Sequence, residues 1–258
     1  MTTKIRRKRA SKNFVFYHGP SMLDGAPIIA VAKIDGSRNG KTGPMVQTYI
    51  LRADVDPREA SKHGLDSSIC GACVHRGKYS LKGELLARTR TCYVVLFHGP
   101  NGIFKAYKRG IYGDLSGDLN QAAERIAGRI VRLGSYGDPA AVPFGVWSAF
   151  LAKMQACTGY THQWRAFPEL AIWVMASCDS MADRVMARAL GFRTFRVAPA
   201  VDWTKESGEA LCPASHEAGK KTTCQACKAC GGHSSKANCD IVIPAHGAAK
   251  RMITGVAA

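Results

Sequence analysis

"ELAIWVMASCDSMADRVMARALGFRTFRVAPA" (169–200) contains a strand, a helix and a second strand in succession, judged from its hydrophobic pattern. Residues 169–177 form a nearly continuous apolar run, which is typical of a strand buried on both faces. Residues 180–191 have the pattern of an amphipathic helix, and Ser180 stands where an N-cap is expected. Residues 192–200 again have the composition of a strand. Two strands separated by one helix predict parallel pairing through a helical crossover.

The same alternation extends along the chain in both directions. Helical patterning recurs at 118–128 and 143–157. The segment 102–110 is expected to pair with 91–97 as a hairpin. Further strands are expected at 26–34, 45–53, 91–97, 129–139, 159–164 and 239–247. This alternation predicts an α/β fold, namely a complete or partial (β/α) barrel with cysteine-rich metal-binding loops; a doubly wound open sheet is the alternative.

Length and charge indicate how the chain is organised. Its 258 residues, of which 46% are hydrophobic, suffice for one large domain. We expect a basic flexible arm at 1–14, followed by a single α/β barrel-like domain at 15–258 with a cysteine loop at 212–239. An excess of 36 Lys and Arg over 19 Asp and Glu gives a formal charge of +17. Such an excess attracts polyanions, so nucleic acid or a nucleotide is the expected partner.

The cellular compartment of the protein decides how its ten cysteines are interpreted. No stretch of eighteen apolar residues is present, so we expect no membrane span. The basic N-terminus is not followed by the apolar segment of a secretory signal, so we expect a cytoplasmic protein. In a reducing cytosol, clustered cysteines are more often metal ligands or catalytic groups than disulfides.

The C-terminal cysteines lie in "CPASHEAGKKTTCQACKACGGHSSKANC" (212–239), with the spacing C-x11-C-x2-C-x2-C-x8-C. They are Cys212, Cys224, Cys227, Cys230 and Cys239. The C-x2-C-x2-C triplet can turn three sulfurs toward one centre, which favours an iron–sulfur cluster over zinc. Cys212 is the natural fourth ligand, and Cys239 is its substitute. Zinc is the alternative, because the same four thiolates, or three of them with His216 or His233, also suit a tetrahedral site.

A second set of cysteines has the spacing C-x2-C-x18-C and consists of Cys70, Cys73 and Cys92. Three thiolates on a four-iron cluster leave one iron open to a substrate or cofactor. A zinc ion with three protein ligands likewise keeps one position for water. His75 or His98 would close the site and make it structural.

Three polar residues are expected where strands end and loops begin, which is where the chemistry of α/β folds takes place. They are Asp138, His162 and Asp179. We expect them to position a substrate or to move protons. The simpler interpretations are that Asp179 belongs to a helix cap and that His162 is a hydrogen-bonded core histidine.

Several segments carry a resemblance to a known family: "DGSRNGKTGPMVQTYILR" (35–52), "CGAC" and "CYV" (70–73 and 92–94), "VRLGSYGD" (131–138), and "CPAS" and "TTCQACKACGG" (212–215 and 222–232). The chain resembles an uncharacterised group of bacteriophage proteins with a radical-SAM-like (β/α) barrel. Such an origin would make the host-cell cytoplasm its location. In the radical-SAM class, three cysteines hold a four-iron cluster whose open iron binds S-adenosylmethionine. The class usually shows C-x3-C-x2-C, whereas this chain has C-x2-C-x18-C.

The resemblance implies that Cys70, Cys73 and Cys92 hold a catalytic cluster and that the C-terminal cysteines hold an auxiliary one. The expected function is that of an iron–sulfur, radical-SAM-like metalloprotein acting on nucleic acid or a nucleotide. The alternative is a zinc-stabilised, nucleic-acid-binding phage protein without catalysis. A third interpretation is a host-takeover or assembly protein in which the bound metals only stabilise the fold.

Overall fold

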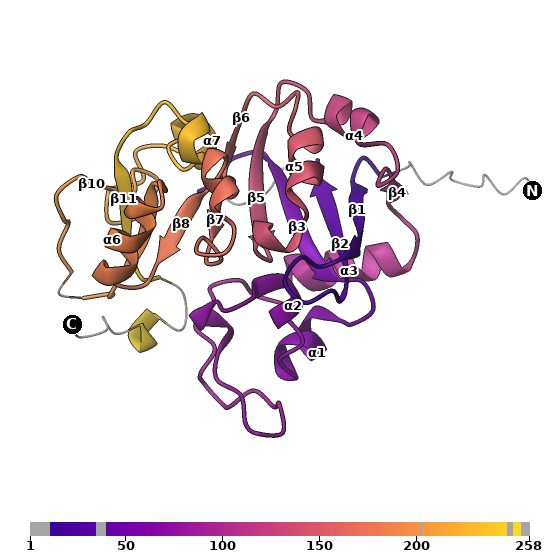
Figure 1. Ribbon diagram of the computed structural model, residues 1–258, viewed down its shortest axis with the longest axis horizontal. Coiled ribbons are helices and arrows are strands. Elements are labelled where there is room, and N and C mark those ends of the chain that lie inside the picture. Colours follow the sequence, from indigo (N-terminus) through magenta and orange to yellow (C-terminus); the bar gives the residue numbers. More distant parts are fainter. Residues whose placement is uncertain (1–10, 35–39, 202, 247–249, 254–258) are drawn as a thin grey trace, which may run out of the picture.

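The structure is a computed structural model that describes residues 11–34, 40–201, 203–246 and 250–253. In chain order its strands are β1 (Phe14–Pro20), β2 (Pro27–Lys33), β3 (Val46–Arg52), β4 (Gly113–Asp114), β5 (Ile130–Tyr136), β6 (Ala156–Thr158), β7 (Tyr160–Thr161), β8 (Met175–Cys178), β9 (Thr194–Ala198), β10 (Glu209–Leu211) and β11 (Asp240–Pro244). Figure 1 shows their arrangement in space.

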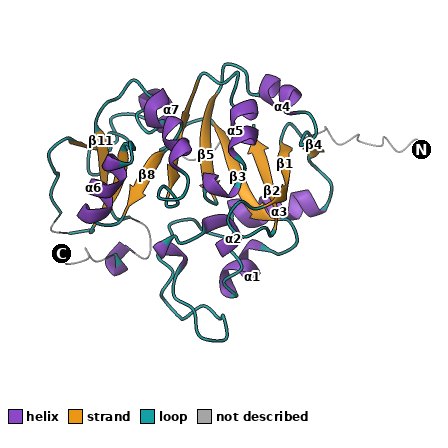
Figure 2. Ribbon diagram, viewed as in Figure 1, coloured by secondary structure: helices purple, strands orange, loops and turns teal. Residues whose placement is uncertain are grey.

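Short helices connect the strands, as the colouring of Figure 2 makes clear. The α-helices are α1 (Pro57–Lys62), α2 (Ser67–Cys70), α3 (Gly99–Lys108), α4 (Leu119–Arg125), α5 (Phe144–Phe150), α6 (Met181–Ala189) and α7 (Cys224–Cys227). The 3-10 turns are η1 (Val74–Arg76), η2 (Pro139–Ala141), η3 (Pro168–Ile172), η4 (Gly232–Ser234) and η5 (Lys250–Met252). No helix within the described ranges is both long enough and apolar enough to cross a membrane.

The strands form two sheets. The first has the order β4-β1-β2-β3-β5-β6 and is mixed, because β2 runs antiparallel to both β1 and β3. The second has the order β10-β11-β9-β8-β7 and is parallel throughout. This arrangement confirms the predicted α/β class.

Gly159 is the residue at which the two sheets meet. It separates β6, which pairs with β5, from β7, which pairs with β8. A side chain at Gly159 would lie 2.8 Å from Cγ1 of Val174, so the glycine permits this close approach. From β3 to β9, the strands of each sheet follow chain order except β4, which lies at the outer edge beside β1. No pairing between the outer strands β4 and β10 occurs in the described residues, so a closed barrel is not shown and an open arrangement is compatible.

Most predicted strands are present: 26–34, 45–53, 129–139, 159–164, 192–200 and 239–247 contain β2, β3, β5, β7, β9 and β11. The predicted hairpin of 91–97 with 102–110 is not present, so this prediction is wrong. Residues 102–108 belong to α3, because Ile103, Phe104 and Ala106 are buried together at helical spacing. Tyr93, Val95 and Phe97 are exposed, Val94 and Leu96 are partly buried against the large core, and no described strand pairs with this segment.

Other predicted element boundaries also differ from the observed ones. The apolar run 169–177 forms a strand only from Met175, because its first part is the 3-10 turn η3, which begins at Pro168. The predicted helix 143–157 ends at Phe150, and its last residues belong to β6. Residues 1–10 of the predicted basic arm lie outside the described residues, and β1, which was not predicted, begins at Phe14.

The parallel strands bury their two faces differently. Ala176 and Cys178 of β8 join the large core, which also contains residues of α5 and α6. Both helices lie in front of the strands in Figure 1. Met175 joins a smaller cluster with Phe195 and Ile241 from β9 and β11. Because side chains alternate along a strand, this smaller cluster marks the opposite face of the sheet.

Buried ion pairs fix the last strands, which carry the C-terminal cysteine loop. Arg196 of β9 pairs with Glu209 of β10 at 2.6 Å. Arg184 of α6 pairs with Asp240 of β11 at 3.0 Å. All four side chains are at least 90% buried, so removing one partner would leave an uncompensated charge and cost about 3–5 kcal/mol.

Candidate functional site

A cavity of about 480 Å³ lies against the face of the strands that turns away from α5 and α6. Its floor is made by side chains at alternate positions of β5, β6, β7, β8, β9 and β11. They are Arg132, Gly134, Tyr136, Thr158, Tyr160, Ser177, Phe195, Val197, Ile241 and Ile243. The period-two pattern of these strands therefore gives the cavity one continuous surface.

Both predicted cysteine sets face this cavity. The cysteines that line it are Cys70, Cys73, Cys92, Cys212, Cys224, Cys227 and Cys230. All ten cysteines of the chain are free thiols. Cys239, which was also predicted as a ligand, does not line the cavity, and its carbonyl accepts a hydrogen bond from Arg193. The structure thus brings seven of the eight predicted ligands to one space.

The first set lies at the carboxyl end of the parallel strands. Cys70 ends α2, and its carbonyl accepts a hydrogen bond from Gln163, which follows β7. Gly71 turns the chain with φ +54°, and a side chain there would collide with Gln163 at 2.5 Å. The amide of Cys92 donates to the carbonyl of His75 at 2.9 Å. This hydrogen bond holds Cys92 near the segment that contains Cys70 and Cys73.

The C-x2-C-x2-C triplet of the second set lies near the amino end of β3, whereas Cys212 directly follows β10. α7 begins at Cys224, whose amide donates to the carbonyl of Lys41, before β3. Lys228 has a left-handed φ of 56° at the end of α7, which reverses the chain toward Cys230. The carbonyl of Cys230 accepts from the amide of Gly159 at 3.0 Å. The sheet junction therefore also anchors this loop.

The protonation of these thiols depends on their burial. Burial raises the pKa of Cys70 well above its ordinary value and raises the pKa of Cys230 to about 12. Burial also raises the pKa of Cys92, although the charge of Arg90 opposes it. A bound cation would reverse this effect, because the thiolate is the ligand and binding releases its proton.

The candidate metals need different spacings of the sulfurs. Zinc–thiolate bonds of about 2.3 Å in a tetrahedron place the sulfurs about 3.8 Å apart. Over the described parts of the chain, no three potential ligand atoms that include a cysteine sulfur lie within 4.8 Å of one another. A four-iron cluster binds each cysteine to a different iron and so needs wider spacing.

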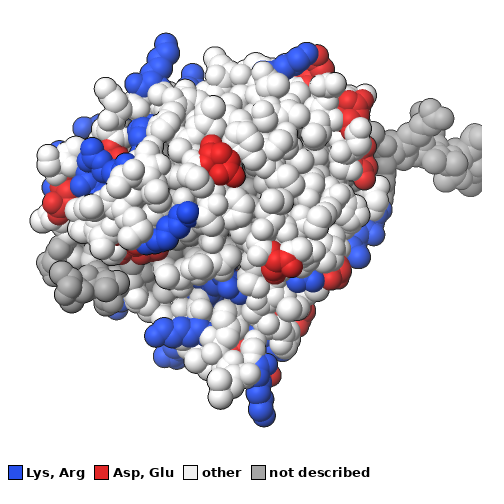
Figure 3. Space-filling view, viewed as in Figure 1, with Lys and Arg blue, Asp and Glu red and all other residues white. Residues whose placement is uncertain are grey.

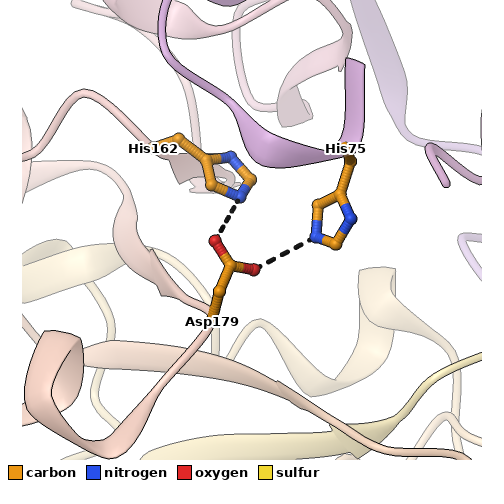
Figure 4. Close-up of side chains that lie close together, drawn as sticks. All are labelled: His75, His162 and Asp179. Atoms are coloured by element: carbon orange, nitrogen blue, oxygen red, sulfur yellow. Dashed lines mark hydrogen bonds and ion pairs between the residues drawn. The ribbon is translucent and has the colours of Figure 1, made fainter. Parts of the chain in front are cut away.

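Beside the first set, His75, His162 and Asp179 come together (Figure 4). Nε2 of His75 lies 3.1 Å from Oδ1 of Asp179, and Nε2 of His162 lies 3.5 Å from Oδ2. Burial alone would raise the pKa of Asp179, but its hydrogen bonds to the two histidines hold that pKa well below its ordinary value. His75, which the sequence indicated only as a closing ligand, thus joins two predicted catalytic residues.

Asp138, the third predicted catalytic residue, lies behind this group. Its carboxylate accepts from the amide of His162 at 2.8 Å, the hydroxyl of Thr161 at 2.7 Å and the amide of Ala140 at 3.0 Å. Burial raises the pKa of Asp138, against the opposing effect of these hydrogen bonds. With both oxygens engaged, Asp138 positions His162 at the end of β7.

The cavity also contains polar groups that the sequence analysis missed. Arg132, which is 9% exposed, donates to the hydroxyl of Tyr93 at 3.0 Å and lies over the ring of Tyr160. The hydroxyls of Tyr136 and Thr158 are buried without a hydrogen-bond partner among the described residues. An arginine inside the apolar strand pattern of 129–139 was the signal that could have identified this surface.

These features define an α/β protein in which two cysteine sets and a buried arginine share one cavity. A scan against protein-family models, a search of curated proteins and a search of solved structures found no match.

Proposed function

We propose that this protein is an iron–sulfur enzyme of the radical-SAM-like kind that acts on a nucleotide or on nucleic acid. The observation that carries the proposal is that both cysteine sets line one cavity. Two sites that only stabilised the fold would not need to face a common space of ligand size. The resemblance of the cysteine-bearing segments to radical-SAM-like phage proteins supports the same assignment, with the parallel strands as a partial barrel.

In this proposal the two sets have different roles. Three thiolates (Cys70, Cys73 and Cys92) hold a four-iron cluster with one open iron. The cysteines of the second set hold a closed cluster through Cys212, Cys224, Cys227 and Cys230. When bound, the open cluster would supply an electron to S-adenosylmethionine. Among the chain's own residues, His162 would help to position the substrate at the cavity edge, with Asp179 holding its side chain and Asp138 its backbone.

The charges around the cavity favour an anionic ligand. The basic lining residues are Lys41, Arg76, Arg90, Arg132 and Lys228. The acidic lining residues are Asp66, which pairs with Arg76 at 2.7 Å, and Asp138, whose oxygens are fully engaged. A volume of about 480 Å³ suits a small molecule of nucleotide size. On the opposite face, which α5 and α6 cover, Figure 3 shows Lys and Arg in separate groups among uncharged residues.

Replacing Arg132 by glutamine is expected to weaken the binding of a nucleoside triphosphate by about 10- to 100-fold, because a buried charged hydrogen bond is lost. Equilibrium dialysis with labelled ATP, GTP, CTP and UTP measures the effect. Arg109→Gln is the matched control, since Arg109 is exposed beyond α3 and does not line the cavity. Equal affinity in the two variants, or no binding by the wild type, would contradict an anionic ligand at this position.

Elemental analysis of protein purified without oxygen tests the metal assignment. Two four-iron clusters would give about eight irons per chain and a brown protein. A colourless protein with stoichiometric zinc would instead support the zinc-stabilised nucleic-acid-binding protein. In that case affinity for nucleic acid should fall steeply with salt.

A further inference from the structure

We propose that His75, His162 and Asp179 bind one divalent transition-metal ion at a site separate from both cysteine sets. Figure 4 shows the two imidazole rings turned toward the same carboxylate. One ligand atom from each residue lies within 4.8 Å of the other two. The residues come from three different elements: His75 from η1, His162 from the end of β7 and Asp179 from the end of β8.

The distances suit a common metal ion. Bonds of about 2.0–2.2 Å from a metal to histidine nitrogen and carboxylate oxygen place neighbouring ligand atoms about 3–3.5 Å apart. Nε2 of His75 lies 3.1 Å from Oδ1 of Asp179, and Nε2 of His162 lies 3.5 Å from the other oxygen, Oδ2. Two histidines and one carboxylate form the ligand set of catalytic zinc and of non-haem iron(II), and both leave coordination positions open.

The neighbours of the ligands hold them in place. Nδ1 of His75 lies 2.8 Å from Oγ1 of Thr91. Assigning the proton to Nδ1, which donates to this hydroxyl, leaves the Nε2 lone pair directed at the site. The amide of His162 is fixed by Asp138. Sγ of Cys73, which belongs to the first cysteine set, lies 3.8 Å from Nε2 of His162, so the proposed site lies directly beside that set.

The site is accessible enough to exchange an ion. The side chains of His75, His162 and Asp179 are 15%, 19% and 23% exposed. Both histidines also line the cavity, so an open coordination position would face the bound ligand. The proposal does not depend on iron at the cysteines, because its three ligands are nitrogen and oxygen donors. The competing interpretation is an ion-paired cluster in which two histidines share the charge of Asp179.

Titration of the full chain with Co²⁺ after anaerobic cluster reconstitution tests the site. The measured quantity is the difference in bound Co²⁺ between wild type and Asp179→Asn, with iron counted in the same samples. One equivalent should be lost in Asp179→Asn and in His75→Ala, with iron unchanged. Thr91→Val should bind about 10- to 100-fold more weakly, since it removes only the hydrogen bond to a ligand. Ser180 rather than Asp179 caps α6, so the asparagine variant keeps the helix start.

His63→Ala is the control, because His63 is an exposed histidine ion-paired to Glu59. It should bind Co²⁺ as the wild type does. If the cysteines hold no iron, they will also bind Co²⁺, but thiolate ligation gives intense near-ultraviolet charge-transfer bands that imidazole and carboxylate do not. The number of Co²⁺ equivalents lost when Asp179 is replaced can then still be measured. Equal Co²⁺ binding by wild type and Asp179→Asn would overturn the proposal, whatever the iron content.

Discussion

Serine at Cys70 is expected to remove about four of about eight irons per chain, and serine at Cys224 to remove the other four. Each substitution deletes one thiolate from a separate set, because Cys70 ends α2 in the first set and Cys224 begins α7 in the second. Iron analysis and visible absorption of oxygen-free protein measure the loss. A double variant should hold almost no iron.

The two control variants use cysteines that do not line the cavity. Cys157→Ser should keep all the iron, because the Cys157 thiol is buried and contacts the carbonyl of Trp173. Cys239→Ser should also keep it, whereas Cys212→Ser should lose half, since Cys212 and not Cys239 lines the cavity. Loss of all the iron from Cys70→Ser alone would contradict two separate sites and indicate one shared centre.

The strand–helix–strand unit at 169–200 could be predicted because its signals are local. The hydroxyl of Ser180 does accept from the amide of Asp183, as the capping pattern indicated. The strand predicted at 91–97 is wrong for the opposite reason: its apolar composition suits a strand, but none of the strands in the described part of the chain pairs with it. Composition alone does not establish pairing, because β-propensity depends on neighbours across the sheet.

The residue types of the site could also be predicted, but their convergence could not. Cysteine spacing identified both sets, yet the shared cavity depends on contacts between distant parts of the chain. The amide of Cys224 bonds to the carbonyl of Lys41, and His75 meets Asp179 across 104 positions of sequence. Arg132 reaches the cavity only because alternate residues of β5 face it. Such relations follow from topology rather than from any local pattern.

Alanine at Gly232 is expected to destabilise the protein by about 3 kcal/mol or more and to release the iron of the second set. Gly232 has φ +55°, and an added Cβ would lie 2.3 Å from the carbonyl oxygen of Ala171 and 2.7 Å from the amide nitrogen of Val174. Both are backbone atoms, so a side-chain rotation cannot relieve the overlap. Overpacking costs about 1–3 kcal/mol, and a left-handed non-glycine residue adds about 1–2 kcal/mol.

Gly219→Ala separates these two effects, because Gly219 has φ +77° in the same loop but open space around its Cα. Gly219→Ala should lower the free energy of unfolding by only about 1 kcal/mol, which is the cost of a left-handed non-glycine residue, and the variant should keep its iron. Urea unfolding and iron analysis of both variants make the comparison. Arg193 donates to the carbonyl of Gly232 at 3.1 Å, so a shift of Gly232 would also break the bond that ties this loop to the strand leading into β9. Equal unfolding midpoints for the two variants would contradict the close packing of the cysteine loop against η3 and Val174, on which the position of the second set depends.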